Sequence, residues 1–340
     1  MATRMLLQLG VASNKCVFSS SLQKSKLQLQ NVIKHNFRKV RDNNDLVQTQ
    51  SFLGSGSTEM LWSGPSAGNK LLRAFVFASG FTGASFVGAT IWEYERIRDR
   101  TYKTLNPFGY RFRSSVTGWR SNAKEWWMNL TEGQRMFWFI CYANALVFVA
   151  WKIPSIRPTM LKYFATNPVS NVTCLPMVLS MFSHFNLWHL AANMYVLHSF
   201  STAAVGYLGK EQFLAVYLSS GVMSSFVSNA YKILLNRHGF SLGASGAIMG
   251  ILAFICTQFP DTKLSIIMLP QFTFSAGSAI KAIMAFDTAG CVMGWQFFDH
   301  AAHLGGALFG IIWQFWGLEH VWRKRGPLLQ YWHEIRNPPK

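Results

Sequence analysis

Seven stretches of this chain are apolar enough to form transmembrane helices, and they constrain the fold more than any other feature. A helix needs about 20 apolar residues to cross a bilayer core. Half of the 340 residues are hydrophobic and 14% are charged, against roughly 25% charged residues in ordinary soluble domains. We therefore predict an all-α polytopic membrane protein with spans at 74–92, 136–151, 186–208, 212–231, 243–259, 264–286 and 300–318.

The first 70 residues show no sustained apolar periodicity and are expected to lack a packed fold. Residues 1–41 hold eight Lys and Arg and no acid, which is typical of a mitochondrial transit peptide; a disordered basic tail is the alternative. This leader supplies nearly half of the net charge of +18, and much of the rest flanks apolar runs, where basic residues anchor helices at the interface. Nucleic acid binding is therefore not expected.

The remaining boundaries follow the apolar runs. Residues 71–134 are expected to hold an extra transmembrane helix and a charged connector, 135–320 the functional core, and 321–340 a basic tail. Gly80, Ala84 and Gly88 have the spacing that lets a second helix approach the first span closely. Positive charge lies on both sides of the spans, so the positive-inside rule does not decide the orientation.

The five cysteines indicate neither a disulfide framework nor a zinc site. Their number is odd and no two form a CxxC pair, whereas both kinds of site have recognisable paired spacings. Cys141 and Cys256 fall within apolar runs, where a thiol behaves as a small hydrophobic side chain. No metal and no cofactor are predicted.

Ser245 is placed where a hydroxyl nucleophile would be useful, at the start of the apolar run 243–259. The first backbone N–H groups of a helix have no partner inside it, so they are available to bind a developing oxyanion. Reactive groups at membrane depth are costly and usually functional. Taken alone, the sequence Gly-Ala-Ser-Gly is also typical of ordinary helix packing.

His303 gives the serine a candidate base within the last apolar run. Gly306 and Gly310 follow it at GxxxG spacing, and the serine run carries Gly246 and Gly250. Small residues on two facing helices permit close packing, which would bring the imidazole within hydrogen-bonding distance of the hydroxyl. A structural histidine is the alternative, and we expect that role for His198 and His300.

His189 and Asn193 are the third element. They are four residues apart and so share one helix face. An imidazole and an amide on one face suit an oxyanion site, which the backbone N–H of Ser245 would complete. The alternative is a polar contact between membrane helices, since both residue types make such contacts.

Taken together, these elements resemble the rhomboid intramembrane serine proteases. The matching segments are 184–193 (HFNLWHLAAN), 243–246 (GASG) and 302–306 (AHLGG), and the resemblance covers roughly residues 135–320. It implies a core of six helices and a Ser–His dyad with no acidic third member. By the same resemblance, Ser245 is the nucleophile, His303 the base, and His189, Asn193 and the Ser245 N–H form the oxyanion site.

Further features resemble the mitochondrial inner-membrane branch, the presenilin-associated rhomboid-like proteases. These are the extra span, the basic leader and the segments 298–303 (FDHAAH) and 332–336 (WHEIR). This resemblance implies single-span inner-membrane substrates linked to mitochondrial dynamics, mitophagy and apoptosis. It also implies an N-terminus in the matrix and a C-terminus in the intermembrane space.

The sequence departs from the family pattern at two points. Many bacterial rhomboids have a tyrosine four residues after the serine, stacked on the catalytic histidine, and this chain has Met249. The Trp-Arg pair of the first core loop is missing between 154 and 183, a proline-broken segment that we expect to lie partly in the interface. Two other functions stay open: an inactive relative that escorts membrane clients, and a transporter with a polar path.

Overall fold

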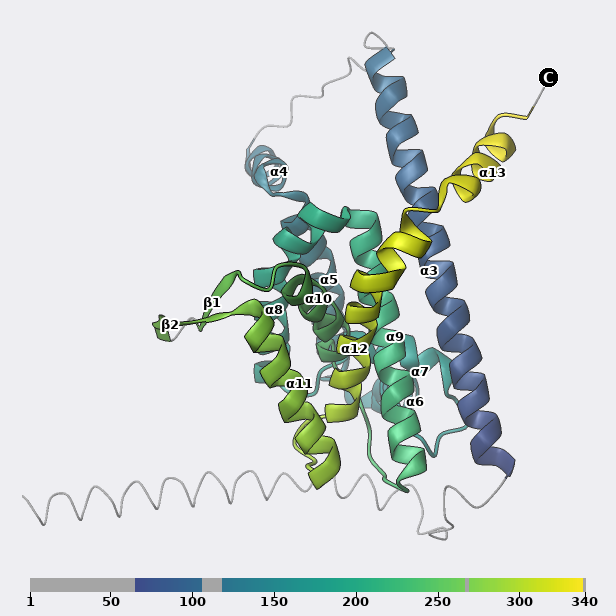
Figure 1. The fold of residues 1–340 in the computed structure, drawn as a ribbon, viewed down its shortest axis with the longest axis vertical. Helices are drawn as coiled ribbons and strands as arrows, with labels where there is room; N and C mark the ends of the chain where they lie inside the picture. The colour runs from purple at the N-terminus through teal and green to yellow at the C-terminus, as the bar shows by residue number, and fades with distance from the viewer. Residues whose placement is uncertain (1–64, 106–117, 267–268, 339–340) are drawn as a thin grey trace, which may run out of the picture. The chain divides into compact units, whose positions relative to one another are not determined.

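Helices make up almost all of the regular structure of this protein (Figure 1). The computed structural model describes residues 65–105, 118–266 and 269–338. The predicted transit peptide therefore lies outside the described residues. The prediction of an all-α polytopic membrane fold is confirmed, because the described chain is a bundle of apolar helices with one small β-hairpin.

Helix α3 (Pro65–Leu105) is much longer than the predicted first span. At 1.5 Å per residue its 41 residues extend about 60 Å, roughly twice the hydrocarbon core. It packs against α9 (Lys210–Leu234) and buries side chains such as Ala74, Ala78 and Phe86. It begins within the segment expected to be unfolded and continues into the predicted connector.

The small residues of α3 do not make the predicted close helix contact within the described part of the chain. A Cβ atom added to Gly80 or Gly88 would meet nothing within 4 Å, and Ala84 is exposed. The helix buries other side chains instead, among them Ala78, Ala89 and Phe86, and the Phe86 ring stacks on that of Trp313. The spacing predicted one face of α3 that consists of small residues. A helix that is apolar on several sides can pack through another face.

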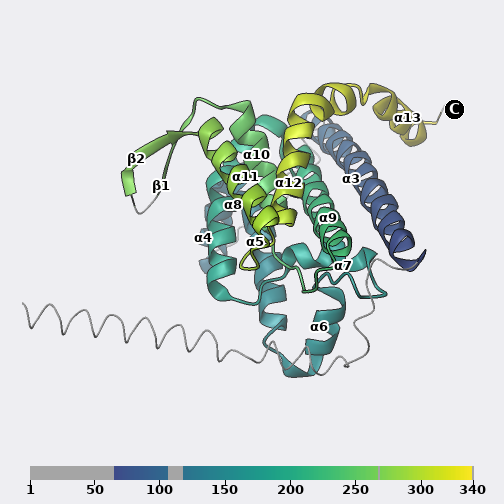
Figure 2. The same ribbon diagram turned by 60° about the horizontal axis from the view of Figure 1, so that its bottom comes forward.

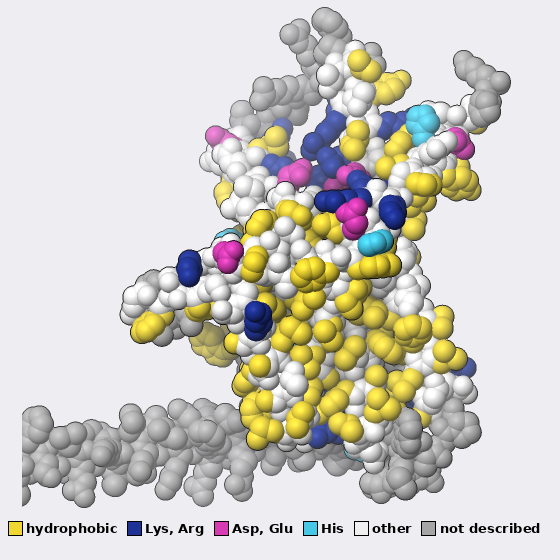
Figure 3. All heavy atoms as spheres, viewed as in Figure 1, with side chains coloured by type: hydrophobic (Ala, Val, Ile, Leu, Met, Phe, Trp, Pro, Cys, Tyr) yellow, Lys and Arg dark blue, Asp and Glu magenta, His cyan; other side chains and the backbone are white. Residues whose placement is uncertain are grey.

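The C-terminal end of α3 is tied to the bundle by charged groups. Arg96 pairs with the buried Glu211 of α9 at 2.5 Å, and Glu93 pairs with Arg325 at 2.8 Å. The predicted basic tail contains α13 (Gly326–Arg336), whose Trp332 donates to Glu95 at 3.0 Å. Figure 3 shows charged side chains gathered at this end, beyond the apolar surface of α9, α11 and α12.

The segment between α3 and the site contains several short elements. After α4 (Trp119–Asn129), α5 (Glu132–Ala150) begins at a capping box made by Thr131 and Gln134. The proline-broken segment forms η2 (Pro154–Ile156), α6 (Arg157–Tyr163), α7 (Cys174–Leu179) and η3 (Ser180–Phe182). Figure 2 shows α6 beside α7 at the edge of the bundle.

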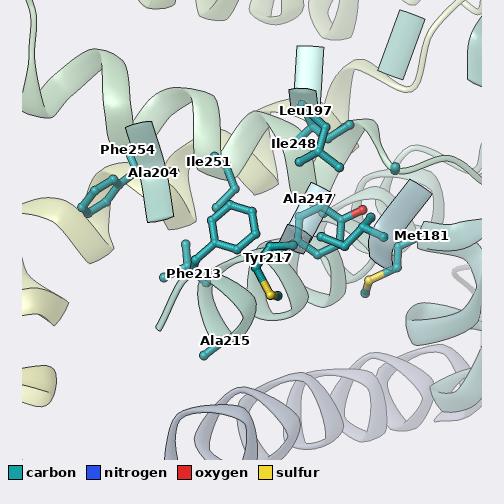
Figure 4. Close-up of a cluster of buried hydrophobic side chains, with 14 of the residues drawn as sticks. Met181, Leu197, Ala204, Phe213, Ala215, Tyr217, Ala247, Ile248, Ile251 and Phe254 are labelled. Atoms are coloured by element: carbon teal, nitrogen blue, oxygen red, sulfur yellow. The ribbon is translucent and has the colours of Figure 1, made fainter. Parts of the chain in front are cut away.

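The most buried helix is α10 (Ser245–Gln258), which begins at the candidate nucleophile. It contacts α8 (Leu187–Leu208), α9, and α12 (His300–Ile312), which runs on as the π-helix η4 (Trp313–Trp322). Figure 4 shows its Ala247, Ile248 and Ile251 in one buried cluster with Leu197 of α8 and Phe213 and Tyr217 of α9. These helices lie within a few residues of the predicted spans.

The predicted span 264–286 is wrong. Its first half forms an antiparallel hairpin, β1 (Lys263–Ile266) and β2 (Leu269–Ser275), and the helix α11 runs from Ala276–Met293. Proline is strongly unfavourable in a helix interior, so Pro270 keeps this part extended. Ser275 then caps α11 by accepting a hydrogen bond from the N–H of Ser278 at 3.2 Å.

The number of core helices stays a prediction. By length and composition, α3, α9 and α11 qualify as spans in the described chain, and α5 with α6 forms a pair bent by 95°. The helix α10 is apolar but short. Such a helix reaches the middle of a bilayer from one side, which places its first residue at depth if its other end is at the surface.

Candidate active site

Ser245 and His303 are brought together by two helix beginnings that lie far apart in sequence. Ser245 is the first residue of α10, and His303 lies in the first turn of α12. His303 Nε2 and Ser245 Oγ are 3.0 Å apart. This is hydrogen-bonding distance, the arrangement in which an imidazole can take a proton from a hydroxyl.

Glycines set the separation of α10 from both α12 and α9. A Cβ on Gly306 would lie 1.9 Å from the carbonyl oxygen of Gly246, and one on Gly310 would lie 2.1 Å from that of Gly250. On the α10 side, a Cβ on Gly246 or Gly250 would overlap a serine hydroxyl of α9. The two backbones therefore touch directly, and the Ser245–His303 distance depends on this contact.

The loop before Ser245 is fixed by backbone hydrogen bonds. The N–H of Gly243 donates to the carbonyl of Ser180 at 2.9 Å, and the N–H of Ala244 donates to His184 Nε2 at 3.4 Å. His184 is fully buried. His184 was not among the predicted site residues, although its position in the family-like segment 184–193 was the available signal.

Of the two predicted oxyanion side chains, His189 lies close to Ser245, whereas the Asn193 amide is hydrogen-bonded within its own helix. A Cβ built on Gly243 would lie 3.3 Å from His189 Nε2 and 3.8 Å from Ser245 Oγ. The imidazole and the hydroxyl therefore border the same small space. Asn193 is on the same face of α8, but its amide donates to the carbonyl of His189 at 2.9 Å, so at least one of its hydrogens is engaged within the helix.

A buried acid adjoins His303 on the side away from Ser245. Asp287 Oδ1, on α11, lies 3.2 Å from His303 Nδ1 and 2.7 Å from His300 Nδ1. Asp287 was not among the predicted site residues, because the predicted span ended at Phe286. The available signal was a lone carboxylate in an apolar helix, which is costly in a membrane and usually functional.

A methyl group at Gly243 is expected to block this space. Gly243 has φ +132, and the added carbon of Gly243→Ala would lie 2.9 Å from His189 Cε1. We expect peptide cleavage to fall at least about 10²-fold, since small misplacements in active sites have effects of that order. The measurement is kcat/KM on a tagged single-span protein in detergent.

Gly239→Ala is the matched control for this experiment. Gly239 has a similar φ of +127, but its Cβ would meet nothing within 4 Å. The control carries the backbone strain without filling the space. Equal losses in both variants would contradict the role of the space between His189 and Ser245.

Comparison with known proteins identifies the family of this chain. Residues 173–320 match the Rhomboid domain. The chain is 53% identical to the presenilin-associated rhomboid-like protein, mitochondrial, of Rattus norvegicus over 276 residues, covering 79% of this chain and 73% of the relative. The Homo sapiens protein of that name is 52% identical with the same coverage. This chain belongs to the presenilin-associated rhomboid-like branch of the rhomboid family.

A more distant relative is also a mitochondrial rhomboid. Rhomboid protein 1, mitochondrial, of Saccharomyces cerevisiae is 33% identical over 202 residues, which cover 59% of this chain and 58% of the relative. The chain is thus a mitochondrial membrane protein of a family of intramembrane proteases.

Met249 occupies the position of the bacterial tyrosine in this rhomboid. Met249 is buried with Leu252, Ala253 and Ala307 in a small hydrophobic cluster. The aromatic ring beside the histidine comes from the loop before α12, where the Phe298 ring centre lies 6.1 Å from that of His303. The contact with His303 therefore comes from a different element.

Proposed function

We propose that this rhomboid hydrolyses peptide bonds in or beside the membrane helices of single-span inner-membrane proteins, with Ser245 as nucleophile and His303 as base. The observation that carries the proposal is the 3.0 Å contact between Ser245 Oγ and His303 Nε2. It is formed at the beginnings of two closely packed helices, in a chain of a protease family. Gly306 and Gly310 permit the close α10–α12 contact that the reaction requires.

The first half of the reaction forms an acyl-enzyme. Ser245 Oγ attacks the scissile carbonyl carbon while His303 Nε2 takes the hydroxyl proton. The negative charge on the carbonyl oxygen faces the Ser245 N–H and the imidazole of His189, with Asn193 as the third donor once its amide turns toward the site. The imidazolium then gives its proton to the leaving amine nitrogen as the C–N bond breaks.

The second half repeats these steps with water. His303 removes a proton from the water as its oxygen attacks the ester carbonyl, and the proton then returns to Ser245 Oγ as the ester bond breaks. A peptide bond within a regular helix is shielded by its own hydrogen bonds. Substrates with glycine or proline near the cut are therefore preferred, because those residues weaken the helix.

The cellular setting is proposed by likeness to the branch. The names of the relatives place those proteins in mitochondria and associate them with presenilin. For this chain we infer the inner membrane, an N-terminus in the matrix, and substrates connected with mitochondrial dynamics, mitophagy and apoptosis. The lipid bilayer is the second partner, in contact with the apolar surface visible in Figure 3.

A fluorophosphonate probe, which reacts with activated serines, tests the proposal. The purified full-length protein in liposomes is incubated with the probe, and the labelled residue is found by mass spectrometry. We expect label on Ser245 alone, parallel loss of cleavage of a co-reconstituted single-span protein, and no label in His303→Ala. Cleavage without label at Ser245 would refute the nucleophile. Neither label nor cleavage would favour an inactive escort protein or a transporter.

A further inference from the structure

We infer that Asp287 is a positioning residue for the dyad, so that the site works as a Ser–His–Asp arrangement with His300 as a second support. This inference rests on the proposed function and extends it. The resemblance to the family implied a dyad with no acidic third member, and the structure of this chain places an acid there. Asp287 does not touch the space in front of Ser245, and it acts through the imidazole of His303.

The distances form an unbroken line of hydrogen-bonding groups. Ser245 Oγ lies 3.0 Å from His303 Nε2, and His303 Nδ1 lies 3.2 Å from Asp287 Oδ1. The same oxygen lies 2.7 Å from His300 Nδ1. The Asp287 and His300 side chains are both 2% exposed, and that of His303 is 17% exposed. The acid is therefore shielded, while the base is open to the site.

One set of tautomers satisfies all three contacts. An ionised carboxylate only accepts hydrogen bonds, so both Nδ1 atoms carry hydrogens and donate to Asp287. The Nε2 atom of His303 then has a free lone pair directed at the Ser245 hydroxyl, as a general base requires. Neutral His300 leaves its buried, unpartnered Nε2 as a lone pair, which costs less than a buried N–H with no acceptor.

The side chains around Asp287 and His300 hold the two contacts of Asp287 in place. A Cβ on Gly290, one turn after Asp287, would lie 2.5 Å from the His300 ring, so glycine lets that ring lie against α11. The rings of Phe286, Trp295 and Phe297 surround His300 with centres 5.2–5.9 Å away. This apolar enclosure strengthens the hydrogen bonds to the carboxylate and holds it in place.

The other nearby acid is fully engaged elsewhere. Asp299 caps α12 by accepting from the N–H of Ala302 at 3.0 Å. Its second oxygen accepts from Ser228 and Ser241 and pairs with Lys232 at 3.2 Å. Only its backbone carbonyl meets His303, through the N–H of that residue. Asp287 is therefore the acid that faces the imidazole of His303.

The first test compares Asp287→Asn, Asp287→Glu and the exposed control Asp261→Asn in the full-length protein. We expect Asp287→Asn to lower kcat roughly 10²- to 10³-fold with little change in KM, because an amide can stabilise the wrong tautomer of the base. Asp287→Glu should recover part of the rate, and Asp261→Asn should behave as wild type. Thermal unfolding checks that each variant is folded.

The pH profile separates this role from a structural one. Asp287→Asn removes the carboxylate that contacts the imidazole of His303, so the pH profile of kcat should change, whereas a variant that only loosens the fold should keep the wild-type profile. The other groups facing His303 from neighbouring elements are Ser245, His189 and His300. Asp299, which pairs with Lys232, contacts His303 through its backbone carbonyl. All of these groups are the same in both proteins. An unchanged kcat and pH profile would overturn the inference.

Two further measurements cover a variant that does not fold. In wild type with ¹⁵N-labelled histidine, assigned with His303→Ala, NMR should show His303 protonated at Nδ1 at neutral pH; protonation at Nε2 would overturn the inference. His300→Phe should lower kcat less than Asp287→Asn, and an equal loss would show that Asp287 acts only through His300. Loss of cleavage in Ser245→Ala, with no effect of Asp287→Asn, would leave the proposed function standing and refute only this inference.

Discussion

His303→Ala is expected to lower kcat for peptide cleavage by about 10⁴- to 10⁶-fold, as much as Ser245→Ala does. Without the imidazole, the hydroxyl keeps its proton and is a poor nucleophile. The two residues act as one unit through their 3.0 Å contact. The double variant should therefore be no slower than either single variant. Single-turnover cleavage of a tagged single-span protein in liposomes measures all three.

His320→Ala supplies the control for this prediction. His320 is exposed on η4, the continuation of the same helix, and contacts the carbonyl of Trp316. Its loss should leave the rate unchanged. Additive losses in the double variant would mean that Ser245 and His303 act independently, and that result would contradict the dyad.

Gly306→Ala is expected to lower both the stability and the cleavage rate, because it forces α10 and α12 apart. The new carbon would lie 1.9 Å from the backbone oxygen of Gly246, where no rotamer change can relieve the overlap. Overpacking of this kind costs about 1–3 kcal/mol of stability. A shift of about 1 Å between base and nucleophile can cost about 10²-fold in rate. Thermal unfolding in detergent and kcat measure the two effects.

Gly88→Ala on α3 is the matched control. It is the same substitution within a helix, and its Cβ would meet nothing within 4 Å. Alanine favours helix by up to about 1 kcal/mol over glycine, so this variant should be as stable as wild type or slightly more stable. If Gly306→Ala were equally harmless, direct backbone contact would not set the geometry of the site.

Hydropathy predicted most of the helices, because a long apolar run in a bilayer must pair its own backbone polar groups, and a helix does so. It placed the helix carrying Ser245 within two residues at its start. It failed in the segment before α11, because the residues of β2, which include Pro270, are apolar although their backbone is extended. Apolar content alone does not distinguish a strand from a helix, and the displaced boundary also hid Asp287.

Spacing and residue type predicted which side chains meet at the site, but not their exact partners. Ser245 and His303 were chosen because each chemistry needs the other, and the glycines indicated how their helices could approach. The hydrogen bond of the Asn193 amide to the carbonyl of His189 depends on a side-chain rotamer. The acid beside His303 depends on how α11 packs against α12, and no local pattern in the sequence encodes that contact.

The tie between Glu93 and Arg325 has a mechanical consequence. From His303 to Trp322 the chain is one uninterrupted helix, and Arg325 lies three residues beyond its end. The far end of the helix that bears the base is thus fastened to the long N-terminal helix by an ion pair. Any sliding of α3 along the bundle must either break this ion pair or displace the helix that carries His303.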